Sequence, residues 1–285
     1  MTARSWREVR ADMAARLAAR TASPDAEARW LCESVSGHGE AEWHEIERTA
    51  PTLRQLANLE ELVAQRLAGE PLQYVLGEWS FRSLDLLVDR RVLIPRPETE
   101  WVVEIALRSV APTGAKRAVD LGTGSGAIAL SLARERPEWS VIATDDSADA
   151  LAVARWNGAG NGIRNVRYLE GDWFDAIPSE LVGSVDLIVS NPPYVAEVER
   201  GNLPPEVVEY EPHRALFAGP DGLDAIRTIV TAAPSWLRPG GVLVVEHAPA
   251  QADEVVAIAG EAGFGDVRCE RDLTGRPRAL VAGRR

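Results

Sequence analysis

The chain has 285 residues, which exceeds the roughly 100–200 residues of a usual domain and predicts two domains. Hydrophobic residues make up 46% of the chain and charged residues 26%, which is typical of a globular protein. No stretch approaches the ~18 apolar residues of a membrane helix, so a membrane span is excluded. The formal net charge of −12 disfavours stable binding to nucleic acid, whose phosphates are neutralised by Lys and Arg. A protein or small molecule is the expected partner.

The first ~70 residues are expected to form a small helical bundle. Trp6, Val9, Met13 and Leu17 recur at helical spacing and make one apolar stripe. Cys32 and the distant Cys269 lack metal-ligand spacing, so we expect no metal site and a reducing, cytoplasmic environment.

A last helix of the bundle is expected from about Thr52. Its apolar positions predict the face that packs on the core. These positions are Leu56, Leu59, Val63 and Leu67.

After Pro71 the apolar residues alternate with polar ones, which predicts a β-hairpin around Arg82-Ser83. From Arg117 onward, apolar strands alternate with helical segments, which indicates a Rossmann-like, mostly parallel sheet covered on both faces. The last two strands, around Val267-Cys269 and Ala279-Val281, suggest a terminal antiparallel hairpin. The predicted domains are therefore residues 1–70 (helical), 71–92 (hairpin linker) and 93–285 (α/β).

A glycine-rich turn follows the first strand of the predicted sheet and opens a helix. Open α/β sheets bind ligands at this position, and glycines without Cβ atoms let a ligand approach the backbone. The candidate cofactor residues in this turn are Gly122, Thr123, Gly124, Ser125 and Gly126. A tight strand-to-helix turn without a ligand is the structural alternative.

The next strand ends in Asp145, whose carboxylate is placed to accept hydrogen bonds from both ribose hydroxyls of a nucleoside. Asp145 is favoured over Asp146, which could instead cap the following helix. After the third strand, Trp173 is a candidate for holding an adenine ring, with a plain core role equally open. The spacing alone does not separate NAD from S-adenosylmethionine.

The fourth strand ends in Asn191-Pro192-Pro193-Tyr194, at the same edge of the sheet as the glycine turn. Two prolines stiffen the loop and remove N–H donors. The Asn191 side-chain oxygen and the Pro192 carbonyl could accept both hydrogens of a planar NH2 group while Tyr194 packs against its plane. We therefore expect this loop to bind substrate, with Asn191, Pro192 and Tyr194 as the catalytic candidates and Asn191 also bordering the cofactor. A simple loop terminator is the alternative.

Taken together, these motifs resemble those of the peptide chain release factor glutamine methyltransferases, the PrmC/HemK family. The resemblance covers most of the chain. It is carried by PLQYVLG at 71–77, IPRPETE at 94–100, DLGTGSGAIAL at 120–130, ATDDS at 143–147, GDWF at 171–174, NPPY at 191–194 and LRPGG at 237–241. The IPRPETE segment is the most specific of these, because NPPY is shared with adenine amino-methyltransferases.

The resemblance implies a class I methyltransferase fold that uses S-adenosylmethionine and releases S-adenosylhomocysteine. It implies methyl transfer to the glutamine amide of the Gly-Gly-Gln loop in class I release factors, with the helical domain holding that protein. It also implies cofactor roles for Gly122 to Gly126, Asp145 and Trp173, and a glutamine site at Asn191 to Tyr194. The IPRPETE segment either helps to close the site or simply starts a helix at Pro97.

Two other functions are weighed against this one. An enzyme acting on adenine in DNA or RNA would meet the same NH2 geometry, but the acidic charge and the lack of a basic, aromatic-rich segment disfavour it. A non-catalytic cofactor-binding protein is disfavoured by the intact glycines, Asp145 and NPPY. The sequence departs from the family where Val245-Glu246-His247-Ala248 replaces the more usual Glu-Ile-Gly, which leaves the roles of Glu246 and His247 open. The roles of Arg96 and Glu98 are also left open.

Overall fold

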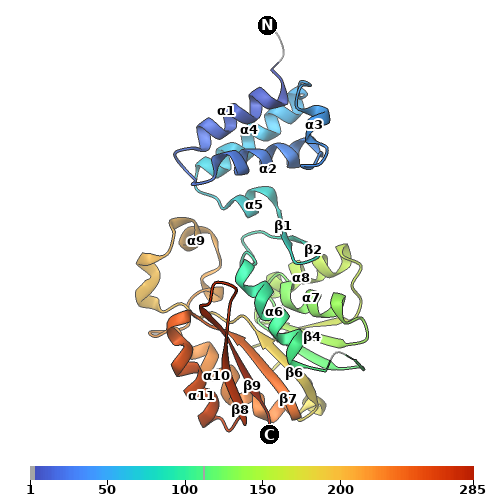
Figure 1. Cartoon of the computed structure of the whole chain (residues 1–285), viewed down its shortest axis with the longest axis vertical. Helices are drawn as coiled ribbons and strands as arrows, with labels where there is room; N and C mark the ends of the chain where they lie inside the picture. Colours follow the sequence, from blue (N-terminus) through green and yellow to red (C-terminus); the bar gives the residue numbers. More distant parts are fainter. Residues whose placement is uncertain (1–3, 112) are drawn as a thin grey trace. The chain divides into compact units, whose positions relative to one another are not determined.

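The computed structural model describes residues 4–111 and 113–285, which form two compact units (Figure 1). Unit 1 contains the described residues up to Gly77 together with Pro204–Tyr210, and unit 2 contains Glu78–Leu203 and Glu211–Arg285. No helix among the described residues is both long and apolar enough to cross a bilayer.

This division departs from the predicted boundaries in two places. Residues 72–76 form a short helix of unit 1 rather than part of the hairpin linker, and Pro204–Tyr210 joins unit 1 although it lies far from Gly77 in the sequence. Pro204–Tyr210 belongs to unit 1 because of a buried ion pair, which is described below. No local sequence pattern indicates this ion pair.

Unit 1 is a helical bundle around one apolar core. Capping boxes begin two of its helices, at Ser5 and at Thr52. The apolar stripe from Trp6 to Leu17 is buried as predicted. Its helices are α1 (Trp6–Leu17), α2 (Pro24–Ser36), α3 (Trp43–Ile46), α4 (Leu53–Leu67), α5 (Leu72–Leu76) and α9 (Pro205–Tyr210).

The predicted inner face of α4 is wrong at its last position. Leu59 and Val63 are buried, but Leu67 is 40% exposed and Arg66 is only 4% exposed. Arg66 takes the inner position because Glu27 of α2 accepts from its Nε at 2.8 Å and from its Nη2 at 3.2 Å, and Glu206 of α9 accepts from its Nη1 at 3.1 Å. This paired charge fixes α9 to unit 1.

Unit 2 begins with the predicted hairpin. Strands β1 (Glu78–Phe81) and β2 (Leu84–Leu87) pair antiparallel across the two-residue turn Arg82-Ser83. The seven-stranded sheet that follows has the order β5-β4-β3-β6-β7-β9-β8, in which β7 pairs parallel to β6 and antiparallel to β9. Its strands are β3 (Arg117–Leu121), β4 (Ser140–Asp145), β5 (Val166–Glu170), β6 (Val185–Ser190), β7 (Leu237–Glu246), β8 (Asp266–Arg271) and β9 (Pro277–Gly283).

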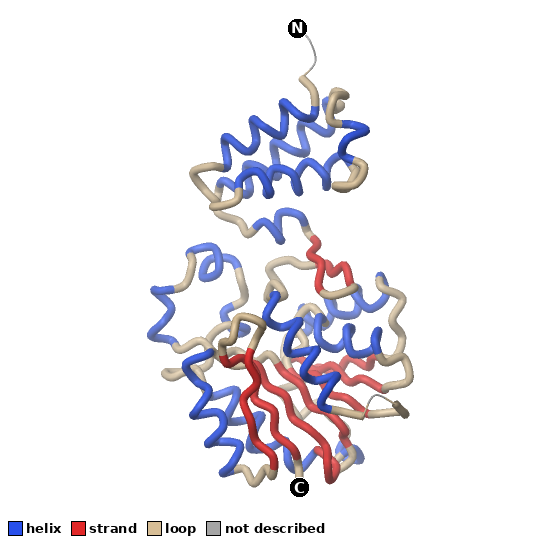
Figure 2. Tube along the Cα trace, viewed as in Figure 1, coloured by secondary structure: helices blue, strands red, loops and turns tan. Residues whose placement is uncertain are grey.

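Alternate residues of each central strand point to opposite faces of the sheet, so each strand contributes to two cores. On β3, Ala118 packs with helices α6 (Pro97–Ser109) and α7 (Ala127–Glu135), whereas Val119 and Leu121 pack with α10 (Asp224–Trp236) and α11 (Ala252–Glu261). The red strands between blue helices in Figure 2 show this layered arrangement, which confirms the predicted fold class. The α-helices of unit 2 are α6 (Pro97–Ser109), α7 (Ala127–Glu135), α8 (Ala148–Gly160), α10 (Asp224–Trp236) and α11 (Ala252–Glu261). Short 3₁₀ helices cover Ser179–Leu181, Glu197–Asn202, His213–Ala215 and Pro249–Gln251.

Candidate active site

The glycine turn and the NPPY loop are neighbours because the strands that precede them are paired. Strands β3 and β6 run parallel, with Leu121 opposite Ser190, and Ser190 Oγ donates to the Leu121 carbonyl at 2.7 Å. Strand order reverses here, with β4 and β5 to one side of β3 and β7 beyond β6. Ligand sites of open α/β sheets lie at such a switch point, beyond the carboxyl ends of the strands.

The glycine turn has a backbone that only glycine adopts without strain. Gly122 and Gly126 have φ of 70° and 87°. A Cβ at Gly122 would lie 3.3 Å from the ring of Trp173, and one at Gly126 would lie 3.0 Å from Leu130 of α7. Trp173 therefore stacks closely beside the turn, where the sequence left its role open between a cofactor contact and the core.

The buried carboxylate of Asp120 holds the glycine turn in place through hydrogen bonds. Asp120 Oδ2 accepts from Thr123 Oγ1 at 2.6 Å and from the Ala129 N–H at 3.1 Å, so the turn and the first residues of α7 share one acceptor. Complete burial raises the pKa of Asp120 to about 7.

Asp145 and Asp146 differ in how firmly they are held. Asp145 accepts from the Gly124 N–H and the Ser147 N–H, each at 2.9 Å, and burial raises its pKa. Asp146 is exposed and its nearest cationic partner is Arg214, at 3.3 Å. Asp145 stays the better candidate for nucleoside hydroxyls because its carboxylate is fixed in place at the strand end.

A pocket with about 950 Å³ of empty space, part of it open to solvent, lies over these strand ends in unit 2. The predicted residues that line it come from the glycine turn, the ends of two strands and the NPPY loop. They are Gly122, Thr123, Gly124, Ser125, Asp145, Trp173, Asn191 and Pro193. Gly126, Pro192 and Tyr194 are not among its lining residues, so the predicted site residues divide into those that line the pocket and those that do not.

The two ends of the NPPY loop are anchored to the protein by different polar atoms. Asn191 Nδ2 donates to Thr99 Oγ1 at 3.1 Å, and the Tyr194 hydroxyl donates to Glu246 Oε1 at 3.2 Å. Burial, followed by the charge of Glu246, raises the pKa of Tyr194 above its usual range. The phenol thus faces the carboxylate of β7, and the expected packing of Tyr194 against a substrate plane stays a prediction.

The IPRPETE segment both starts a helix and lines the pocket. Pro97 is the first residue of α6, and Pro95 and Thr99 are pocket residues. Glu211, which is 4% exposed, accepts from Arg96 Nη2 at 2.5 Å and from the Ile94 N–H at 3.2 Å, which fixes the segment that leads into the helix. The two interpretations of the segment are therefore compatible.

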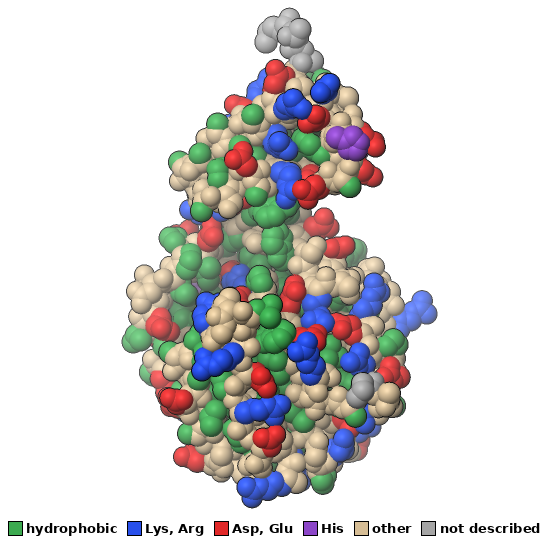
Figure 3. Space-filling model, viewed as in Figure 1, with side chains coloured by type: hydrophobic (Ala, Val, Ile, Leu, Met, Phe, Trp, Pro, Cys, Tyr) green, Lys and Arg blue, Asp and Glu red, His purple; other side chains and the backbone are tan. Residues whose placement is uncertain are grey.

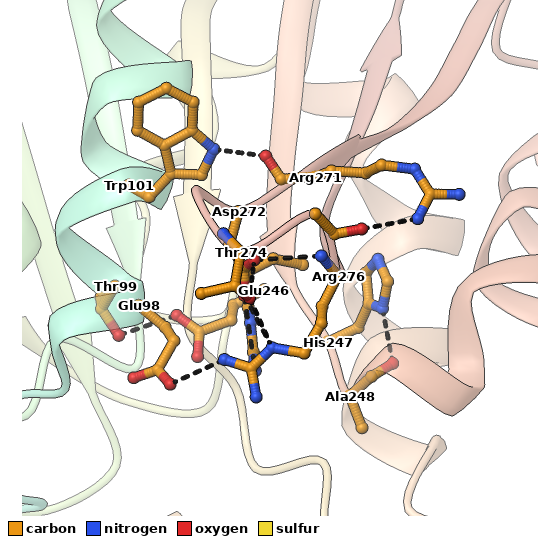
Figure 4. Close-up of polar contacts among 12 residues, drawn as sticks. Glu98, Thr99, Trp101, Glu246, His247, Ala248, Arg271, Asp272, Thr274 and Arg276 are labelled. Carbon is orange, nitrogen blue, oxygen red and sulfur yellow. Dashed lines mark hydrogen bonds and ion pairs between the residues drawn. The ribbon is translucent and has the colours of Figure 1, made fainter.

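Beside the pocket, the turn between β8 and β9 lies against the start of α6 (Figure 4). Arg276 pairs with Glu98 at 3.5 Å, and Trp101 Nε1 donates to the Arg271 carbonyl at 2.7 Å. Asp272 accepts from the hydroxyl of Thr274 at 2.6 Å and orders the turn, and this bond, despite partial desolvation, lowers the pKa of Asp272 to about 2.

Sequence reasoning missed the polar residues behind the loop. Thr99 and Glu246 lie 147 positions apart yet hydrogen bond to each other at 2.8 Å. A polar residue ending an otherwise apolar central strand was the available signal for Glu246, and Asp120 carried the same signal. No comparable signal marked Thr99, which sits inside the first turn of a helix.

His247, beside Glu246, forms a pair with Cys269 that does not have the features of a nucleophile. His247 Nδ1 lies 2.8 Å from the Ala248 carbonyl, and its Nε2 lies 3.2 Å from Cys269 Sγ. Burial lowers the pKa of the imidazole and raises that of the thiol, so both groups are held neutral. Among the described residues, no three His, Cys, Asp or Glu side chains converge to hold a metal ion.

The chain matches two family models. Residues 103–210 match "Methyltransferase small domain", and residues 8–77 match "PrmC N-terminal domain". Among solved structures, the chain is similar to a methyltransferase from Pyrococcus furiosus, with a TM-score of 0.52 and 18% identity over 81% of this chain and 98% of that one. It is also similar to the T. thermophilus 16S rRNA N2 G1207 methyltransferase, solved with AdoMet and guanosine, with a TM-score of 0.53 and 21% identity over 73% of this chain and 50% of that one. At such identities these likenesses show the methyltransferase fold.

The relatives with higher identity extend over both units. The release factor glutamine methyltransferase of Coxiella burnetii is 38% identical over 280 residues, which are 98% of this chain and 99% of that protein. The enzyme of the same name from Streptomyces coelicolor is 43% identical over 263 residues, which are 91% of each chain. With the fold, the two domain matches and this coverage in agreement, the chain belongs to the release factor glutamine methyltransferase family.

Proposed function

We propose that this enzyme transfers a methyl group from S-adenosylmethionine to the side-chain amide nitrogen of the glutamine in the Gly-Gly-Gln loop of class I peptide chain release factors. The observation that carries the proposal is the placement of Asn191. Its side-chain amide borders the pocket, and its nitrogen is already engaged by Thr99. The remaining oxygen is therefore available to accept from a planar NH2 group.

The pocket residues fit the proposed methyl donor. The missing Cβ of Gly122 lets Trp173 lie close against the turn, and a Cβ at Gly124 would have no heavy atom within 4 Å, so the backbone is open there. The fixed Asp145 carboxylate offers acceptors for ribose hydroxyls. These residues would hold the cofactor together with Thr123, Gly124 and Ser125, whereas Gly126 does not line the pocket and packs close to Leu130. When bound, S-adenosylmethionine supplies an electrophilic methyl group on a sulfonium.

The chemistry requires positioning more than acid–base catalysis. An amide nitrogen is a poor nucleophile because its lone pair is delocalised, and no side chain removes its proton at neutral pH. Holding the nitrogen in line with the methyl group can contribute roughly 7–11 kcal/mol. In this proposal the Asn191 oxygen accepts one of the two amide hydrogens and favours the positive charge that develops on nitrogen as the methyl–sulfur bond breaks, after which the nitrogen loses a proton to solvent. The Pro192 carbonyl, proposed as the second acceptor, belongs to a residue that does not line the pocket.

The partner of this site is proposed to be a release factor that meets the enzyme in the cytoplasm, with unit 1 contributing to its binding. Stable binding to nucleic acid is not part of the proposal. On the face drawn in Figure 3, acidic and basic side chains are interspersed, without the continuous basic surface that tracks a phosphate backbone.

A methyl-transfer assay tests the proposal. The purified chain is incubated with S-adenosylmethionine labelled at its methyl group and with a class I release factor, and label is expected in the release factor. A Gln-to-Ala change in its Gly-Gly-Gln loop should abolish the labelling. Persistent labelling of that variant, or labelling of DNA or RNA adenine in its place, would overturn the glutamine assignment.

A further inference from the structure

The carboxylate of Glu246 at the end of β7 is completely buried, and the function proposed above gives it no task. It accepts from Thr99 Oγ1 at 2.8 Å on Oε2 and from the Tyr194 hydroxyl at 3.2 Å on Oε1. Figure 4 shows Thr99 reaching from α6 toward this carboxylate. One buried acid therefore contacts the last residue of the NPPY loop directly and the first residue, Asn191, through Thr99.

The direction of these hydrogen bonds follows from the groups involved. An ionised carboxylate only accepts, so Thr99 must donate its one hydroxyl hydrogen to Glu246. Thr99 Oγ1 is then left with lone pairs alone. The atom of Asn191 that lies 3.1 Å from it must be a donor, which identifies it as Nδ2 rather than Oδ1.

This direction decides what the pocket presents to a substrate. Within residues 4–111 and 113–285, no group hydrogen bonds to Asn191 Oδ1, and Asn191 lines the pocket. The acceptor is therefore the atom left for a substrate amide. A rotated Asn191 would present NH2 to NH2 and repel it.

We propose that Glu246 and Thr99 are positioning residues that set, through a relay of two hydrogen bonds, which atom of Asn191 faces the substrate nitrogen. The proposal rests on the methyl transfer proposed above and deepens it. Neither residue is assigned a contact with the reacting atoms.

The protonation state of Glu246 controls whether the relay holds Asn191 in a single orientation. Burial raises the pKa of Glu246 to about 7 against the lowering effects of Thr99, Arg278 of β9 and Tyr194, and Glu98 of α6 raises it further. Arg278 is shared with Asp272, at 3.8 Å. A protonated Glu246 can donate as well as accept, so both orientations of Asn191 become possible and the relay loses its direction.

The first test distinguishes the effect of the Thr99 hydroxyl from the effect of the size of the side chain. Methyl transfer to the release factor is measured for Thr99→Val, Thr99→Ser and, as a control on the same helix, Ser109→Ala, whose hydroxyl bonds the Ile105 carbonyl. We expect Thr99→Val to lower kcat about 100-fold, comparable to the loss of one preorganised polar contact, with KM within about threefold. Thr99→Ser should restore kcat to within about threefold of wild type.

The second test uses pH. Glu246→Gln keeps the shape of the side chain but, like the protonated acid, can donate and accept. The ratio of wild-type kcat to Glu246→Gln kcat should approach one at pH 6 and rise to a plateau above pH 8. Because both enzymes meet the same substrate, titration of the release factor cancels from this ratio.

A third measurement does not depend on activity. The side-chain amide resonance of Asn191 in the ¹⁵N-labelled full chain should shift with pH around 7 in wild type and stay constant in Glu246→Gln. If the wild-type enzyme labels no release factor, the proposed function fails and this resonance still tests the relay. Wild-type kcat in Thr99→Val, a kcat ratio independent of pH, or an Asn191 resonance that does not titrate would each overturn the relay.

Discussion

Asn191 lines the pocket, and its side-chain Nδ2 is hydrogen bonded to Thr99. The sequence predicted that its oxygen would serve a planar nitrogen, and the contact of Nδ2 with Thr99 supplies a physical reason for that orientation. An acceptor held in advance costs no reorganisation when the substrate arrives. At this scale the chemistry depends on hydrogen-bond direction more than on charge.

Replacing Asn191 by Ala should remove this acceptor without disturbing the glycine turn. We expect cofactor affinity, measured by calorimetry, to stay within about threefold of wild type, and kcat to fall by about two to three orders of magnitude. Turnover like that of wild type would show that the loop has a structural role only.

Glu246 should also make stability depend on pH. Its pKa rises from 4.5 in the unfolded chain to about 7 in the fold, so folding favours the protonated form. This contribution is fully present below pH 4.5 and is lost as pH rises through 7, a change of about 3 kcal/mol. The free energy of unfolding of wild type minus that of Glu246→Gln, measured in urea, should fall by about this amount between pH 4.5 and pH 8. A difference independent of pH would contradict the assignment of an ionised buried acid at pH 8.

Among the elements, α4 shows where a periodic pattern misleads. Leu56, Leu59, Val63 and Leu67 are all compatible with one face, but the helix places Arg66 rather than Leu67 toward the core. A bidentate contact with Glu27 compensates the burial of the guanidinium. Hydrophobicity alone does not reveal such a paired charge, because its partner lies on another helix.

This arrangement predicts a large loss of stability on substitution of Glu27 and a small one on substitution of Leu67. Glu27→Ala leaves the buried guanidinium without its bidentate partner and should lower the free energy of unfolding by about 3 kcal/mol. Leu67→Ala, at an exposed position one residue from Arg66, should change it by less than about 0.5 kcal/mol. Urea denaturation of both variants checks this, and a larger loss from Leu67→Ala would restore the face predicted from sequence.

The sheet and the glycine turn could be predicted because their signals are local in the sequence. The relay could not, because its residues meet only in the folded structure. Strand runs, turn glycines and NPPY are local signals, and parallel pairing brings their ends to one edge without further information. Thr99 and Glu246 meet only after α6 packs beside β7, and their sequence neighbourhoods give no indication of the partner. The same is true of Arg66 and Glu206, 140 residues apart.

Across the whole molecule, the chain passes between the two units after Gly77, after Leu203 and after Tyr210. Pro204–Tyr210 lies between the NPPY loop and α10 in sequence but belongs to the helical unit through Glu206, which contacts Arg66 at 3.1 Å and Arg20 at 3.5 Å. The predicted boundaries treated each domain as one continuous stretch and therefore missed this segment.

The ion pairs of Glu206 should hold α9 in its helical unit. Glu206→Gln keeps the side-chain length but weakens both contacts, and hydrogen–deuterium exchange should become faster in residues 205–210 and at the end of α4. Because Glu206 is about one-third exposed, we expect a loss near 1 kcal/mol, smaller than that of Glu27→Ala. Exchange unchanged in both segments would show that other contacts hold α9.

Because the chain crosses between the two units three times, the molecule cannot be divided at one position. A gene fragment that starts at codon 78 still encodes α9, and a fragment that ends at codon 77 lacks the partner of Arg66. No single cut in the polypeptide yields both units intact. Separate expression of the helical unit would require residues 204–210 to be grafted onto it through a designed connection, and the α/β unit would need a short bridge in their place.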